Sequence, residues 1–156
     1  MPSVDQMAAD FAAAAVELAR EFGATLDFSE QSLEDVERIL GQLHDDMHGL
    51  TPVQSLDERR PTTSDLTEMS KLWGSYFGEV VRRRWGGEWS IETYPLSGRD
   101  GQGQRFSTLT LSVAGAKLFP SMKVYRRLTH GDAENLWEFY GKVREKLAAA
   151  PGGKVQ

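Results

Sequence analysis

The apolar positions along the chain repeat with two different periods. In the first half they recur every three or four residues, the spacing of one helix face, and this predicts helices at residues 4–22, about 32–50 and 63–84. Ser3 with Gln6 makes a capping-box pattern before the first helix, and Gly23 is a stop signal after it. The N-terminal half is therefore expected to be mainly helical.

After the third helix the period shortens to two. Residues 88–94 and 106–113 alternate polar and apolar side chains, as half-buried strands do. Residues 117–127 are expected to form a further strand that is bent at Pro120, because proline removes a hydrogen-bond donor from the ladder. Helical spacing then returns in a last helix, which we expect to begin near Asn135.

This order predicts an α+β fold with N-terminal helices, one antiparallel sheet of three to four strands, and a C-terminal helix packed on the sheet. The helix at 63–84 is expected to be central, because its apolar positions cover about half of its circumference. Gly74 and Gly78 lie four residues apart on its flank, a spacing that lets another backbone approach closely. We expect a single domain over residues 1–156, with frayed ends at 1–3 and 150–156, a polar loop at 51–62 and a turn cluster at 97–103.

The composition is that of an ordinary globular protein. Of 156 residues, 40% are hydrophobic and 26% are charged, which argues against wholesale disorder. The chain has no cysteine, so a disulfide scaffold, a cysteine nucleophile and a thiolate metal site are excluded. No apolar run approaches the roughly 18 residues of a membrane span, and no signal-peptide pattern is present. We therefore expect a soluble, cytoplasmic protein.

The net charge of −5 is unevenly divided. Residues 1–78 carry 15 acidic and 5 basic side chains, whereas residues 79–156 carry 8 acidic and 13 basic ones. Two interpretations stay open: the halves neutralise each other across the fold, or the basic half forms a surface that attracts an anionic partner. An acidic protein of this kind is a weak candidate for binding nucleic acid.

Three stretches carry a resemblance to a known group of proteins. They are residues 74–80 (GSYFGEV), 86–89 (GGEW) and 119–128 (FPSMKVYRRL), preceded by 26–29 (LDFS). With these motifs the chain resembles small bacterial proteins that are grouped as a domain-of-unknown-function family. The resemblance covers about residues 26–140 and implies a bacterial origin, but it implies no activity and no catalytic residues.

One cluster has the spacing of metal ligands. His44 and His48 lie four residues apart on one face of the second helix, and Glu37 falls on the same flank. The set lacks a glutamate directly after the first histidine and an obvious fourth ligand. We therefore expect a solvated helix flank and no metal or other cofactor, with a small metal-dependent enzyme as the alternative.

Charged residues near the third helix suggest two further sites. Glu79 lies at the edge of the apolar arc, and a structural ion pair with Arg83 is favoured over a catalytic acid. A partner- or anion-binding surface is proposed from five side chains: Arg82, Arg83, Arg126, Arg127 and Trp89. Because neighbouring strand residues face opposite ways, one of the two arginines on the expected last strand is predicted to pair with an acid instead.

Motifs for common chemistry are absent from the sequence. It has no phosphate-binding loop, no dinucleotide fingerprint and no nucleophile elbow. We therefore expect a non-enzymatic module that binds another protein, in the manner of an adaptor, an immunity protein or a chaperone. Binding of a small molecule in a pocket between sheet and helices is the alternative, together with the metal-dependent enzyme.

Overall fold

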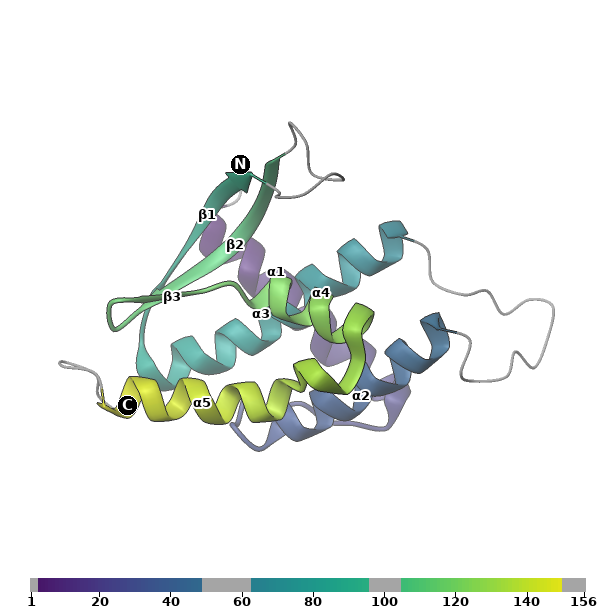
Figure 1. Ribbon diagram of the computed structural model, residues 1–156. Coiled ribbons are helices and arrows are strands. Elements are labelled where there is room, and N and C mark those ends of the chain that lie inside the picture. Colours follow the sequence, from purple (N-terminus) through teal and green to yellow (C-terminus); the bar gives the residue numbers. More distant parts are fainter. Residues whose placement is uncertain (1–2, 49–62, 96–104, 150–156) are drawn as a thin grey trace.

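The computed structural model describes residues 3–48, 63–95 and 105–149 (Figure 1). Within these ranges it contains five α-helices and one three-stranded antiparallel sheet, so the predicted α+β class is confirmed. The polar loop, the turn cluster and the frayed C-terminal end that the sequence predicts lie outside the described residues. Ser3 caps the first helix, as its spacing from Gln6 predicts, and its hydroxyl accepts a hydrogen bond from the Gln6 N–H at 3.1 Å, so it is not part of a frayed end.

Helix α1, Val4–Ala19, turns its smallest side chains toward the core. Four alanines on one face are buried: Ala8, Ala12, Ala15 and Ala19. Their methyl groups let α1 pack closely on α3, Thr63–Trp85. The larger side chains of Met7 and Phe11, which the sequence placed on the core face, lie beside this contact and are only half-buried.

Helix α3 is the central helix, as its wide apolar arc predicts. Every residue from Trp73 to Val81 is buried. A Cβ atom on Gly74 would lie 2.6 Å from the backbone of Ser121, and one on Gly78 would lie 2.1 Å from the Trp89 indole. Because neither position accepts a side chain without displacing its neighbour, the close packing predicted at both glycines is confirmed.

The sheet has the order β1-β2-β3 and consists of β1 (Glu88–Pro95), β2 (Arg105–Val113) and β3 (Ala116–Leu118). Trp89 lies opposite Leu111, and Ile91 lies opposite Leu109. All four side chains share one face, because successive strand residues point to opposite sides. Helices α1, α3 and α4 contact the sheet, while the hairpin of β1 and β2 extends past them (Figure 1).

The segment after β3 is a helix, so the strand predicted at residues 122–127 is wrong. Helix α4 spans Pro120–His130. Proline is well suited to the first turn of a helix, because the N–H that it lacks has no partner there. Ser121, Val124 and Leu128 are buried at steps of three and four residues. This helical periodicity outweighs the strand preference of the Val124–Tyr125 pair.

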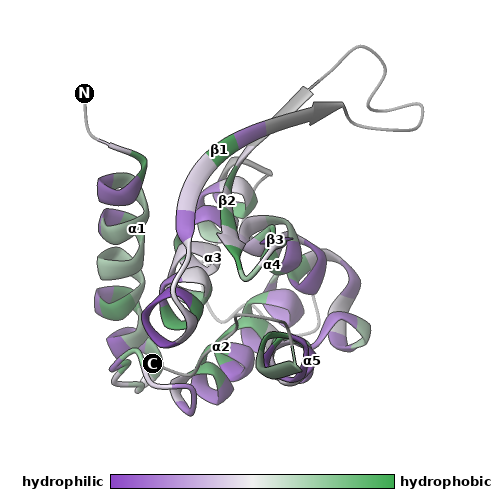
Figure 2. Ribbon diagram, turned by 90° about the vertical axis from the view of Figure 1, so that its left-hand side faces the viewer, coloured by the Kyte–Doolittle hydropathy of each residue, from purple (hydrophilic) through white to green (hydrophobic). Residues whose placement is uncertain are grey.

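Helices α2 (Ser32–Met47) and α5 (Leu136–Ala149) lie together at the end of the molecule away from the β1–β2 hairpin (Figures 1 and 2). The predicted C-terminal helix is therefore confirmed. Its packing partners differ from the expectation, because α5 contacts chiefly α2 and α4. The place next to α3 on the sheet, expected for the C-terminal helix, belongs to α4.

Candidate functional site

An apolar cleft of about 220 Å³ opens between the sheet and three helices. Its walls come from α1, the first half of α3, β1, β2 and the first turns of α4. The apolar part of the wall consists of five side chains: Met7, Phe11, Ile91, Leu109 and Tyr125. Sites that bind partners are commonly apolar hollows with a few polar groups, so this cleft is the first candidate for function.

Two of these side chains are exposed although they are large and hydrophobic. Ile91 is 48% exposed and Tyr125 is 36% exposed. No other large hydrophobic side chain among the described residues is exposed to this extent. Single exposed hydrophobic residues are common on protein surfaces, but a contiguous group marks an interaction site. Because both line the same cleft, their exposure is concentrated at one place.

The fold explains why the cleft is left open. Trp89 and Ile91 share one face of β1, yet only Trp89 is covered, because its indole packs over Gly78 of α3. The strand continues beyond this contact, so Ile91 is left at the edge of the core. On the other wall, the alanine face of α1 takes up the contact with α3, which leaves Met7 and Phe11 free to line the cleft.

The cleft contains hydroxyl groups and one charge. The Ser70 hydroxyl donates a 2.8 Å hydrogen bond to the Leu66 carbonyl of its own helix. Among the residues that line the cleft, Lys71 alone carries a formal charge. Its Nζ lies 3.8 Å from a carboxylate oxygen of Glu68, and both side chains are exposed. Such an exposed pair at i,i+3 spacing contributes little and is easily exchanged.

A second, polar hollow of about 470 Å³ lies between α1, α3 and β1, and Glu79 is buried at its wall. The Glu79 carboxylate accepts hydrogen bonds from the Trp89 indole at 2.8 Å and from Arg82 at 2.5 and 3.0 Å. The expected partner Arg83 is present at 3.8 Å, so Arg82 is the closer cation. Burial opposes ionisation of Glu79, but these hydrogen bonds and both arginines outweigh it and lower its pKa. A carboxylate held in this way joins α3 to β1 and is ill suited to give up or take a proton near neutral pH.

The other arginines at the end of α3 also have partners. The Arg83 guanidinium lies 3.6 Å from the centre of the Phe28 ring, a cation–π contact. Arg84 lies 3.2 Å from the carboxylate of Glu30, which stands just before α2. Because both groups connect α3 to the segment before α2, they have a structural role that the sequence did not indicate.

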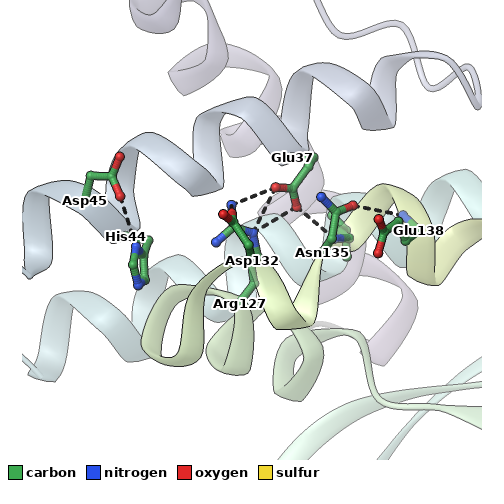
Figure 3. A network of polar contacts seen from close by, with 8 residues as sticks. Glu37, His44, Asp45, Arg127, Asp132, Asn135 and Glu138 are labelled. Atoms are coloured by element: carbon green, nitrogen blue, oxygen red, sulfur yellow. Dashed lines mark hydrogen bonds and ion pairs between the residues drawn. The ribbon is translucent and has the colours of Figure 1, made fainter.

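Arg127 is the most deeply buried arginine of the predicted surface. Its side chain is 3% exposed and binds both carboxylate oxygens of Glu37 on α2, with distances from 2.7 to 3.0 Å (Figure 3). It also donates to Asp132 at 3.2 Å. Glu37 in turn accepts a hydrogen bond from the Leu136 N–H at the start of α5, at 2.8 Å. This network joins α2, α4 and α5, so Arg127 lies inside the fold and not on a surface.

The candidate metal ligands are not brought together as a set. The His44 and His48 rings lie at a tilt of 31° with their centres 4.2 Å apart, and His44 packs against Gly131. The Glu37 carboxylate oxygens accept hydrogen bonds from Arg127 and from the Leu136 N–H, so they are not directed at the histidines. Over the described parts of the chain, no group of three or more histidine, aspartate or glutamate side chains has the geometry to hold a metal ion.

The five residues of the predicted binding surface are therefore divided among different places. Arg82 and Trp89 meet at Glu79, Arg83 covers Phe28, Arg127 is buried, and Arg126 is exposed on α4. The prediction that one of the last two arginines pairs with an acid is confirmed, although they lie on a helix.

Among the described residues, three ion pairs cross between the two charged halves of the chain: Glu37 with Arg127, Glu30 with Arg84, and Glu30 with Arg144. They support the interpretation that the acidic and basic halves neutralise each other. The other interpretation, in which the basic half forms a surface that attracts an anionic partner, stays a prediction.

Sequence reasoning allowed a pocket between sheet and helices as an alternative, and the apolar cleft lies there, but it named none of the lining residues as site residues. Ile91 has the ordinary position of an inward-facing strand residue, and Tyr125 was assigned to a strand that is in fact α4. One signal was available: the buried face of α1 can consist of alanines alone, which leaves Met7 and Phe11 without a place in the core.

No helix among the described residues combines the length and the apolar character that crossing a bilayer requires. Comparison of the chain with protein-family models, with curated proteins and with solved structures found no significant match in any of the three. The case for function therefore rests on the geometry of the cleft.

Proposed function

We propose that this protein is a non-enzymatic module that binds another protein, and that the apolar cleft receives a hydrophobic side chain of that partner. One observation carries the proposal: Ile91 and Tyr125 line the same cleft, and they are the large hydrophobic side chains that are exposed among the described residues. Protein interfaces obtain much of their binding energy from a few large side chains that fill pockets on the partner.

The size of the cleft favours a side chain over a free ligand. Pockets for drug-sized molecules typically measure about 300–1,000 Å³ and enclose most of the ligand. A volume of about 220 Å³ lies below that range and is suited to one large or two small side chains. The small-molecule alternative therefore requires a ligand of few atoms. A metal-dependent reaction at His44 and His48 has no comparable support, because Glu37 is bound elsewhere.

Site-specific photo-crosslinking in the native host tests the proposal. A photoreactive phenylalanine analogue is placed at Ile91, and in a matched control at Lys142, which is exposed on α5 at the other end of the molecule. We expect a discrete crosslinked polypeptide from position 91 and none from position 142. The same adduct is expected to disappear when Tyr125→Asp introduces a charge into the cleft. The same adducts from both positions, or none from position 91, would contradict the proposal.

A further inference from the structure

The cleft combines apolar surface with one charged group, the Lys71 ammonium. Besides apolar side chains, the lining residues provide five hydroxyl groups, one of them the phenol of Tyr125, and a single ammonium group. There is no carboxylate among them to attract a cation. An occupant that is purely apolar leaves the Lys71 charge unused, and an occupant with a positive charge is repelled by it.

Lys71 is available for a new partner. Its contact with Glu68 is long, at 3.8 Å, and both side chains remain in contact with water, since Lys71 is 43% and Glu68 68% exposed. An exposed pair of this geometry contributes little to stability, so exchanging Glu68 for another carboxylate is nearly neutral in free energy. The first turns of α4, which reach the cleft through Ser121 and have no side-chain cap, add partial positive charge of the same sign.

We propose that the occupant is a polypeptide segment in which a large hydrophobic residue stands next to a carboxylate, with the hydrophobic side chain in the cleft and the carboxylate on Lys71. This inference rests on the proposed function and specifies the chemistry of the partner. The hydrophobic group supplies the affinity. The carboxylate selects among partners and speeds association at low salt.

Three blocked peptides that differ at one position test this selectivity: acetyl-Gly-Gly-Phe-Glu-Gly-Gly-amide and the same peptide with Gln or Lys in place of Glu. Binding is followed by titration of the isotope-labelled full chain, using the backbone amide signals of Ile91, Thr108 and Tyr125. We expect all three to shift these signals, with the Glu peptide binding about two- to fivefold more tightly than the Gln peptide and the Lys peptide most weakly. The preference is expected to vanish in Lys71→Met and to decline when salt is raised.

Each outcome separates the two proposals. Equal affinities of the Glu and Gln peptides for the wild-type chain, with shifts at the cleft, would overturn the role of Lys71 and leave the protein-binding function standing. An absence of shifts at Ile91 and Tyr125 with every peptide would overturn both. Decanoate, a free amphipathic acid, is titrated in the same way to test for a small ligand. If decanoate binds more than tenfold more tightly than the Glu peptide, the cleft is assigned to a small ligand instead. Self-association seen by light scattering, and lost in Ile91→Lys, would assign it to a second copy of the chain.

Discussion

At the end where α2, α4 and α5 meet, the Arg127 side chain is 3% exposed and both oxygens of Glu37 are occupied. Around the cleft, Ile91 is about half exposed and Lys71 has only a distant partner. In the first region paired charges join three helices, whereas in the second apolar and charged groups lack an equivalent partner among the described residues. A mutation in the first region should change stability, and one in the second should change recognition.

The largest effect is expected at the buried ion pair. Arg127→Met leaves the Glu37 carboxylate buried without its cation, which should lower the free energy of unfolding by about 3–5 kcal/mol. Arg126→Met is the matched control on the same helix, and because Arg126 is exposed its effect should stay within about 0.5 kcal/mol. Urea denaturation of both variants measures the difference. Similar losses in the two variants would remove the contrast on which the comparison rests.

The next largest effect is expected where α3 and α4 touch. Gly74→Leu forces a side chain against the backbone of Ser121, which cannot rotate away, and should cost about 3 kcal/mol, the upper end of the range for overpacking. Gly141→Ala on α5 is the control, because a Cβ there meets nothing within 4 Å. It should instead raise stability by about 0.5–1 kcal/mol. Thermal or urea melts that rank the two variants the other way would refute the close contact.

An intermediate effect, dependent on pH, is expected at Glu79. Its pKa is lower in the folded chain than the ordinary value of 4.5, so its ionised form stabilises the fold above that value, and this contribution is lost as the pH falls through the folded pKa. Glu79→Gln should therefore cost about 1.5–3 kcal/mol at pH 7, and progressively less as the pH falls below 4.5 and through the lowered pKa of the folded chain. Arg82→Met should shift the loss to higher pH, because one of the two cations is gone. Urea melts over a series of pH values test this, and a cost that does not depend on pH would contradict it.

The smallest effect on stability is expected at the cleft. Ile91→Thr should change the free energy of unfolding by no more than about 1 kcal/mol, because about half of the side chain is already exposed to water. Leu111→Thr, on the same face of the sheet but fully buried, should cost several times more. If Ile91→Thr is as damaging as Leu111→Thr, the cleft is part of the core and not a recognition surface.

Sequence patterning predicted four of the five helices, α1, α2, α3 and α5, and the strands β1 and β2, because their periodicity is long and regular. The central position of α3 followed from the width of its apolar arc, and the close contacts at Gly74 and Gly78 followed from their spacing. The pattern failed at residues 122–127, where Val124 and Tyr125 have high strand propensity. There the deciding features were Pro120 in the first turn of a helix and the burial of Val124 and Leu128 one turn apart.

The candidate site was harder to predict, because it depends on pairings between distant parts of the chain. Glu37 was noted as a metal ligand from its neighbours on α2, but its actual partner Arg127 is 90 residues away and no local pattern identifies it. The cleft depends on how far β1 extends past α3, which is a property of packing. Residue types alone therefore indicated charged candidates that serve as internal links, and missed the apolar ones that are left exposed.

The position of Glu37 in the chain has a consequence for the order of synthesis. Its two partners, Arg127 and the Leu136 N–H, follow it by 90 and 99 residues. At typical rates of about 5–20 residues per second, a ribosome needs roughly 5–20 s to produce them. Throughout that interval α2 carries a carboxylate whose cation has not yet been made. Final docking of α2 is therefore coupled to the release of the last helix.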